Sequence, residues 1–315
     1  MQISANLNSD TGIFGIKVIS HRGFFLACLV LTVGVLVTGV VLDFVRGGQG
    51  TPGGPGVGWA MAIHGGAGTI RRELMSPLLE AQYRSELNTA VGAGEVVLAA
   101  GGSALDAVVA SIQVMEESEL FNAGRGAVFT HAGTIEMDAS IMDGRHAPPP
   151  RDIDGSVLER WSAGAVASVT RVHSPIACAR RVMSHSNHVM LASSGADTFC
   201  EEQGLRQELP DYFTTERRYA QLLATVNSTA TQLSESEGRR RVQQEAPAWG
   251  EISASSDSVL FDMGKYGTVG AVARDADGHL AAATSTGGLS NKQHGRVVRS
   301  AILSAASNLP TVQLA

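Results

Sequence analysis

Two sets of hydroxyl-bearing residues in the C-terminal part of the chain have the spacing for nucleophilic chemistry. Thr268 directly follows Gly267, and the cluster Thr284-Ser285-Thr286 precedes two glycines. Threonine is a weak nucleophile at neutral pH unless a base removes its proton. Cleavage between Gly267 and Thr268 would give Thr268 a free α-amine with an ordinary pKa near 8, which can serve as that base. The residues therefore allow a self-cleaved threonine nucleophile, but on their own they favour an ordinary edge strand.

The elements that must position these hydroxyls form a predicted β-hairpin. Apolar and small residues alternate over 269–274, Asp277-Gly278 is a strong turn signal, and residues 280–284 run back. A hairpin of this kind brings Thr268 and the 284–286 cluster to the same edge of a sheet.

A second glycine-rich element lies near the start of the folded part of the chain. A short apolar strand over 60–63 leads into His64-Gly65-Gly66-Ala67-Gly68, where backbone N–H groups can approach a ligand closely. The element resembles the oxyanion loop of esterases, but the chain has no Gly-x-Ser-x-Gly nucleophile motif. Helical spacing over 73–100 and 103–115, with strands over 135–142 and 164–172, indicates a mixed α and β fold.

The composition excludes some classes of protein. A net charge of −6 argues against a nucleic-acid-binding surface. The three cysteines, Cys28, Cys178 and Cys200, fit no zinc pattern and no disulfide framework, so we expect buried thiols.

The N-terminal region predicts a membrane segment. A polar leader (1–23) is followed by an uncharged apolar run, and we expect a transmembrane or signal-anchor helix over 24–45 that inserts through 24–42. A cleaved signal peptide is the alternative. A Gly/Pro linker follows over 46–58. The predicted localisation is therefore the membrane, and otherwise secretory or cytoplasmic.

Motifs spread along the chain resemble those of the plant-type L-asparaginase/isoaspartyl peptidase family of N-terminal-nucleophile hydrolases. They occur in one order from about residue 60 to residue 298 and are quoted as they stand: HGGAG, GGSALDAVVASIQVMEESELFNAGRGAVFT, EMDASIMDG, SPIACARRVM, HVMLASSGA, GTVGAVARDADGHLAAATSTGG and NKQHGRV. The resemblance implies an amidohydrolase that acts on L-asparagine and β-aspartyl dipeptides.

The resemblance also implies a role for each matching residue. Thr268 would be the nucleophile released by cleavage after Gly267, and Thr286 the hydroxyl that hydrogen-bonds it. Arg296 would bind the substrate's α-carboxylate, a task that suits a guanidinium. Asn122 would lie in a loop that supports the nucleophile, together with Gly65 and Gly66.

The resemblance implies no required cofactor, but it does imply a structural sodium ion. Backbone carbonyls of the 115–125 loop would hold the ion, and the residues concerned are Met115, Glu116, Ser118, Phe121, Ala123 and Arg125.

The implied fold is α+β, a four-layer αββα sandwich with an incomplete second half, preceded by the apolar helix. Its first part would span 59–204 with an insertion at 145–162. A flexible segment (205–267) would precede the nucleophile, and the catalytic hairpin would open a β-chain over 268–298. The family implies a homodimer of processed units, small-molecule substrates and no nucleic-acid partner.

The C-terminal tail, 299–315, departs from the family's pattern. Arg299 stands where the family has an aspartate that binds the substrate's α-amino group, so repulsion would oppose binding. We also expect the Thr-Gly segment that supplies the family's oxyanion hole to be missing. The sequence therefore predicts that the chain neither cleaves itself efficiently nor hydrolyses asparagine, and the tail suggests a splice variant, a frameshift or a gene-model artefact. The alternatives are a glycosylasparaginase-like enzyme, a protein-cleaving threonine hydrolase, and a non-catalytic, membrane-tethered truncated homologue.

Overall fold

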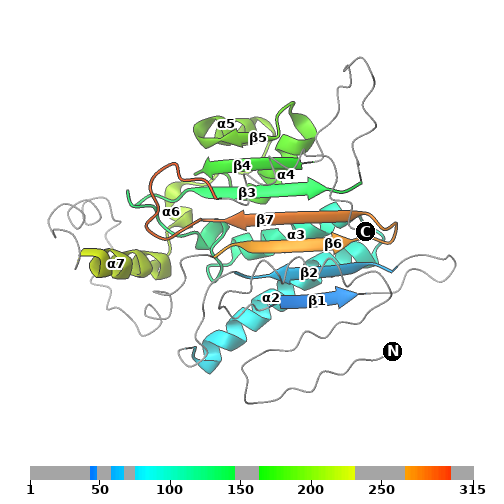
Figure 1. The fold of residues 1–315 in the computed structure, drawn as a ribbon, viewed down its shortest axis with the longest axis horizontal. Coiled ribbons are helices and arrows are strands. Elements are labelled where there is room, and N and C mark those ends of the chain that lie inside the picture. The colour runs from blue at the N-terminus through cyan, green and yellow to red at the C-terminus, as the bar shows by residue number, and fades with distance from the viewer. Residues whose placement is uncertain (1–42, 48–57, 67–74, 146–162, 231–266, 299–315) are drawn as a thin grey trace.

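The computed structural model describes residues 43–47, 58–66, 75–145, 163–230 and 267–298, and these residues build one seven-stranded sheet with helices (Figure 1). Among the strand pairs of these described residues, β4 and β5 are parallel and the others are antiparallel. The predicted mixture of α and β structure is thus confirmed. Across the sheet the strands are β1 (Asp43–Gly47), β2 (Ala60–His64), β6 (Val269–Arg274), β7 (Leu280–Thr286), β3 (Met137–Asp143), β4 (Ala163–Val169) and β5 (Met190–Ala192).

The predicted hairpin is present and lies in the middle of the sheet. Strands β6 and β7 pair from Val269 opposite Ser285 to Arg274 opposite Leu280. Gly278 has φ 89°, a conformation that glycine adopts without strain, so the turn forms where the sequence predicts it. Strand β7 runs two residues further than predicted and includes Thr286.

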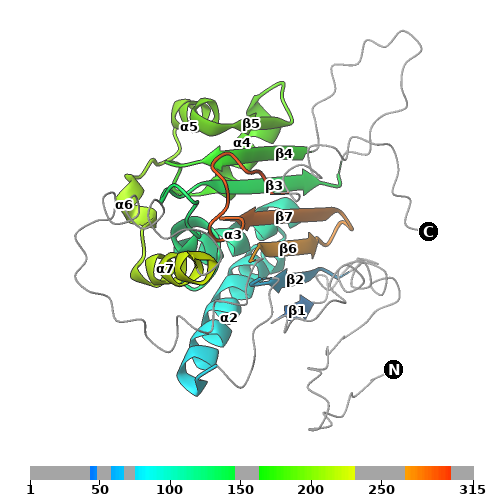
Figure 2. The same ribbon diagram turned by 60° about the vertical axis from the view of Figure 1, so that its left-hand side comes forward.

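Three amphipathic helices cover one face of the sheet (Figures 1 and 2). They are α2 (Pro77–Ala99), α3 (Ala104–Glu117) and α4 (Pro175–His185), and each begins after a serine whose hydroxyl accepts a backbone N–H of the first turn. In β7, Ala281, Ala283 and Ser285 are buried on the helix side. Leu280 and Ala282, on the opposite face, are exposed.

Within the stretch over 205–267 that was predicted to be flexible, the described residues 205–230 include two helices. Helices α6 (Pro210–Phe213) and α7 (Glu216–Ala230) follow α5 (Ser193–Glu202) and lie beyond the end of the sheet at which β7 ends (Figures 1 and 2). Phe213 and Leu222 are each 1% exposed, so both helices belong to the core. Residues 231–266 lie outside the described residues, as do 146–162 of the predicted insertion.

Two of the cysteines are paired, which the sequence did not predict. Cys178 of α4 and Cys200 of α5 are fully buried and form a disulfide, with their Cα atoms 5.6 Å apart. Their burial agrees with the prediction, but the packing of α4 and α5 is what brings the two thiols together.

The predicted membrane localisation is contradicted. In the part of the chain that the structure describes, no helix is both long and apolar enough to span a bilayer. The end of the predicted apolar helix, and the start of the predicted linker, instead form strand β1, whose backbone pairs with β2 from Asp43 opposite His64 to Gly47 opposite Ala60. Residues 24–42 lie outside the described residues.

Candidate active site

The two predicted hydroxyl residues meet where β6 begins and β7 ends. The Thr268 hydroxyl donates a hydrogen bond to Thr286 Oγ1 over 3.3 Å, and the N–H of Gly288 donates to the same oxygen over 2.9 Å. The Thr286 hydroxyl in turn donates to the carbonyl oxygen of Gly267 at 2.8 Å. The chain of hydroxyls thus runs from the predicted nucleophile to the carbonyl that it would attack.

A second donor, Asn122, reaches the same carbonyl oxygen. Its side-chain Nδ2 lies 2.8 Å from Gly267 O and 2.7 Å from Gly288 O. The Gly267 oxygen therefore accepts hydrogen bonds from Asn122 and from Thr286 at once. Two donors directed at one carbonyl oxygen are the arrangement that stabilises the negative charge of a tetrahedral intermediate.

Asn122 is itself held on several sides. Its Oδ1 accepts from the N–H of Val128 at 3.0 Å, and its backbone oxygen accepts from the N–H of Gly287 at 3.0 Å. A Cβ on Gly287 would lie 2.5 Å from Asn122 Oδ1, so only glycine lets the end of β7 approach so closely. Asn122 is 7% exposed, and its amide orientation is fixed by these contacts.

The His-Gly-Gly element contributes packing around this site. His64 is paired with Gly270 in the sheet, and a Cβ on Gly270 would come within 2.2 Å of the His64 ring. Burial lowers the pKa of His64 from 6.5 to about 4, which keeps the imidazole neutral. A Cβ on Gly65 would lie 2.6 Å from the ring of Phe121, whereas Gly66 has open space around it. Gly65 therefore supports the loop of Asn122 by close packing.

Glu116 has a side-chain role that the sequence did not reveal. Its carboxylate accepts from the hydroxyls of Ser285 and Ser174, each at 2.6 Å, and from the N–H of Ile176 at 2.9 Å. Burial raises its pKa to about 7, against the opposing effect of these hydrogen bonds. Glu116 thus ties β7 to the start of α4 on the helix side of the sheet. One feature of the sequence could have indicated this role: Glu116 directly follows the apolar face of the predicted helix over 103–115.

Arg296 lies in a loop that folds back beside Thr286. The N–H of Arg296 closes a turn on Gln293 O at 3.1 Å, and Val298 donates its N–H to Asp138, the cross-strand partner of Thr286. The predicted substrate-binding arginine is therefore on the same end of the sheet as the two threonines. Arg299 lies outside the described residues.

The 115–125 loop has carbonyl oxygens that point into its interior. A Cβ on Gly126 would lie 2.0, 2.8 and 2.9 Å from the carbonyl oxygens of Phe121, Ser118 and Glu119, and a Cβ on Gly124 would lie 2.3 Å from that of Glu116. Glycine is therefore required at both positions. Of the predicted ligands, Glu116, Ser118 and Phe121 have carbonyls in this cradle, and hard cations prefer oxygen donors of this kind. The Ala123 carbonyl accepts from the N–H of Gly126.

A buried arginine of α7 also holds this loop. Arg218 is 3% exposed, and its guanidinium donates to Gly126 O at 2.5 Å and to Leu120 O at 3.4 Å. Burial lowers the pKa of Arg218 to about 10. The helix that leads toward the predicted cleavage point is thus attached to the loop that carries Asn122.

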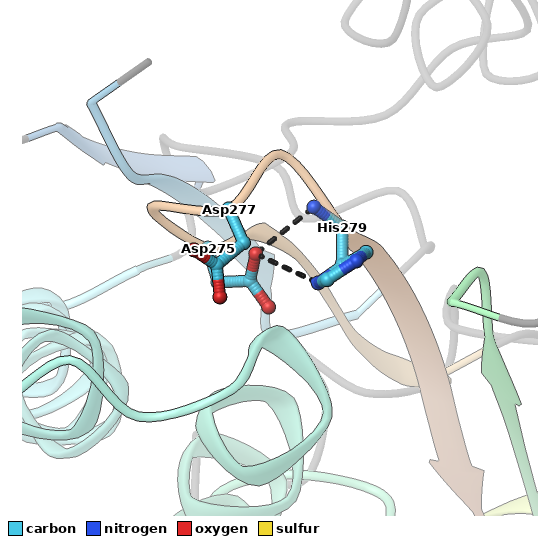
Figure 3. Close-up of side chains that lie close together, drawn as sticks. All are labelled: Asp275, Asp277 and His279. Atoms are coloured by element: carbon cyan, nitrogen blue, oxygen red, sulfur yellow. Dashed lines mark hydrogen bonds and ion pairs between the residues drawn. The ribbon is translucent and has the colours of Figure 1, made fainter. Parts of the chain in front are cut away.

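A group of potential metal ligands occurs in the β6–β7 turn (Figure 3). One ligand atom each of Asp275, Asp277 and His279 lies within 4.8 Å of the others. Asp275, however, already accepts the N–H groups of His279 at 2.9 Å and of Ala104 at 3.1 Å. The turn is therefore a structural cap that joins the hairpin to the start of α3.

Comparison with known proteins gives the class of the protein. A family described as Asparaginase matches residues 57–308. The isoaspartyl peptidases of Salmonella typhimurium and Escherichia coli are both 43% identical to the chain, over 246 and 245 residues. Each alignment covers 78% of this chain, and 67% and 66% of the respective relative. The plant-type L-asparaginase of Pyrococcus abyssi is 38% identical over 257 residues, which is 79% of this chain and 69% of that protein.

These matches define the protein as a member of a class of hydrolases. The chain belongs to the asparaginase family, and it spans about two thirds of the length of the curated relatives. Hydrolases of this family need no cofactor. The match continues to residue 308, beyond Val298, where the motifs predicted that the resemblance ends.

Proposed function

We propose that the chain is an amidohydrolase that cleaves itself between Gly267 and Thr268 and then hydrolyses L-asparagine and β-aspartyl dipeptides. The observation that carries the proposal is the pair of hydrogen bonds that the Gly267 carbonyl oxygen accepts from Asn122 Nδ2 and Thr286 Oγ1, each at 2.8 Å. The relatives named isoaspartyl peptidase and L-asparaginase support the choice of substrates.

In the proposed self-cleavage, Thr268 Oγ1 attacks the carbonyl carbon of Gly267. The Thr268 hydroxyl proton passes to Thr286 Oγ1, and Thr286 gives its own proton to the Gly267 oxygen, on which Asn122 and Thr286 stabilise the developing negative charge. The proton on the Gly267 oxygen then supplies the nitrogen when the carbonyl forms again. The C–N bond then breaks and the nitrogen takes up a proton, which leaves an ester on Thr268 and a free α-amine. Water hydrolyses the ester to the Gly267 carboxylate and regenerates the Thr268 hydroxyl.

In the proposed hydrolysis, the α-amine of Thr268 removes the proton from Oγ1 of the same residue. The oxygen attacks the side-chain amide of the substrate, ammonia or an amino acid leaves, and water releases aspartate from the acyl-enzyme. Arg296 binds the α-carboxylate with paired hydrogen bonds. The sequence predicts inefficient self-cleavage, but the two donors on the Gly267 oxygen support the opposite, and we propose that cleavage occurs.

Three further family properties belong to the same proposal. A second sheet would complete the four-layer sandwich by packing on the face of the sheet where Leu280 and Ala282 are exposed. The processed units would form a homodimer, which the molar mass in solution measures. The carbonyls of Glu116, Ser118 and Phe121 would hold a sodium ion, and a lower melting temperature when choline replaces sodium would support that site.

Mass spectrometry of the purified full chain tests the proposal. We expect fragments that span residues 1–267 and 268–315, ammonia release from L-asparagine, and aspartate release from a β-aspartyl dipeptide. Thr268→Ala should remain intact, whereas Thr268→Ser keeps a hydroxyl and should still be cleaved. An intact wild-type chain would contradict the proposal, and turnover of glycoasparagine in place of asparagine would favour the glycosylasparaginase-like alternative.

A further inference from the structure

Two buried carboxylates stand at the start of β3, on the same end of the sheet as the nucleophile. Glu136 and Asp138 are 2% and 1% exposed, and the fully buried Met137 between them faces the other side of the sheet. Asp138 lies opposite Thr286 in the β3–β7 pair. Burying two negative charges is costly unless each is hydrogen-bonded, so their partners indicate what they do.

The partners include backbone N–H groups on both sides of Arg296, and His294 Nδ1 also lies 2.6 Å from Glu136 Oε1. The N–H of Gly295 donates to both oxygens of Glu136, at 2.9 and 3.2 Å. The N–H of Val298 donates to Asp138 Oδ2 at 2.7 Å. The backbone of the arginine loop is therefore held one residue before Arg296 and two residues after it.

The surrounding groups hold the two carboxylates in turn. Ser168 donates its N–H to Asp138 Oδ1 at 2.8 Å from a left-handed conformation, with φ 50°, at an irregularity in the β3–β4 pairing. Such a conformation is strained for serine, and bulges of this kind often lie next to functional sites. The buried Lys292 donates to Glu136 O at 2.9 Å, and its ammonium lies 4.0 Å from the Glu136 carboxylate.

We propose that Glu136 and Asp138 are positioning residues for Arg296, which fix where its guanidinium meets the α-carboxylate of an aspartyl substrate. The inference rests on the proposed function. A guanidinium binds a carboxylate through two parallel hydrogen bonds, so a small displacement of the loop loses one of them.

Steady-state kinetics with two substrates tests the proposal. L-Asparagine carries the α-carboxylate, whereas L-aspartic acid diamide carries an amide in its place. For Glu136→Gln and Asp138→Asn we expect KM for asparagine to rise about tenfold, the effect of one hydrogen bond to a charged group, while kcat changes little. The kcat/KM for the diamide should stay as in the wild type. Arg296→Lys combined with either variant should cost little more than Arg296→Lys alone.

Asp197→Asn is the matched control. Asp197 is also buried and also accepts backbone N–H groups, those of Thr170, Arg171 and Val172, but it lies on α5 and holds the loop after β4, not the arginine loop. It should leave KM for asparagine unchanged. A fall in kcat without a change in KM in Glu136→Gln or Asp138→Asn would overturn the proposal. A general loss of stability would be recognised because it affects the activity on the two substrates alike.

Two measurements separate this proposal from the function on which it rests. Self-cleavage does not use Arg296, so both variants should be cleaved like the wild type. If the wild type neither cleaves nor hydrolyses, the proposed function fails, and nuclear magnetic resonance then decides the positioning role. We expect faster amide exchange at Gly295 and Val298, and a more mobile Arg296 Nε–H, in the two variants but not in Asp197→Asn. An equally ordered Arg296 in all chains would overturn the proposal.

Discussion

At the scale of single residues, the amide of Asn122 decides how well the Gly267 carbonyl is prepared for attack. It is one of two donors to that oxygen, and its own oxygen is occupied by the N–H of Val128. Replacement of Asn122 therefore removes one donor to the Gly267 oxygen and also leaves the Val128 N–H without this acceptor. The contact joins residues 145 positions apart in the chain, so it exists only when the sheet has formed.

We predict that Asn122→Ala slows self-cleavage by about 10²- to 10³-fold, the usual effect of removing one oxyanion donor. The time course of the two fragments on a denaturing gel measures the rate. Asn88→Ala, at an exposed asparagine of α2, is the matched control and should be cleaved at the wild-type rate. Cleavage of Asn122→Ala as fast as the control would show that Thr286 alone stabilises the charge.

His64 gives a second prediction, which concerns stability and pH. Its folded pKa of about 4 lies below its unfolded value of 6.5, so the unfolded chain binds more protons between these pH values. The stability that a neutral His64 contributes is thus present above pH 6.5 and lost as the pH falls to 4. Each pKa unit corresponds to about 1.4 kcal/mol, so the shift from 6.5 to about 4 sets an upper limit of roughly 3.5 kcal/mol, and the partial exposure of His64 reduces it.

Urea denaturation at pH 7 and pH 4.5 measures this effect. We expect His64→Gln to lose less stability than the wild type between the two pH values. The control His188→Gln changes an exposed histidine and should lose as much as the wild type. Equal losses in all three chains would mean that His64 stays accessible to protons in the folded state.

At the scale of elements, α7 and the 115–125 loop behave as one unit because Arg218 joins them. We predict that Arg218→Met lowers the free energy of unfolding by roughly 2–4 kcal/mol, since it removes the charged donor of the Gly126 and Leu120 carbonyls. Self-cleavage should also slow, because the loop carries Asn122. Urea denaturation and the fragment time course measure the two effects.

Arg181→Met is the control for this prediction, since Arg181 lies on α4, away from the loop. It should change neither measurement by more than a small amount. Loss of stability in Arg218→Met with cleavage at the wild-type rate would show that α7 supports the fold without positioning Asn122.

The strands and helices also differ in how well the sequence predicts them. Alternation of apolar residues and an Asp-Gly turn were enough to predict β6 and β7, and the serines before α3 and α4 mark helix starts by local chemistry. The side-chain roles of Glu116 and Asp138 were not predicted, because their partners lie on distant strands and loops. Strand β1 was missed because its residues fall at the junction of the apolar run and the Gly/Pro linker, and only the pairing with β2 identifies a strand there.

At the scale of the whole molecule, the proposed cleavage point lies directly before the central strands of the sheet. The segment that cleavage would release begins with Thr268 and supplies β6 and β7, which pair with β2 on one side and β3 on the other. The two fragments would therefore share one sheet and one core.

We predict that cleavage does not separate the fragments under native conditions. Size-exclusion chromatography of the cleaved chain should give one peak that contains both fragments, and its melting temperature should lie close to that of uncleaved Thr268→Ala. Separation should require urea concentrations that unfold the protein. Elution of residues 268–315 as a free peptide would contradict this prediction.

The central position of β6 and β7 also constrains how the chain is made. During synthesis, β2 and β3 leave the ribosome long before the β6–β7 hairpin. Until the hairpin has been made, β2 lacks its partner β6 and β3 lacks its partner β7. Only insertion of the hairpin completes the hydrogen bonds of the sheet and brings Asn122 to the Gly267 carbonyl. Self-cleavage would thus occur only in molecules that have finished folding. The fraction of cleaved chains in a cell would therefore report the fraction of chains that have folded.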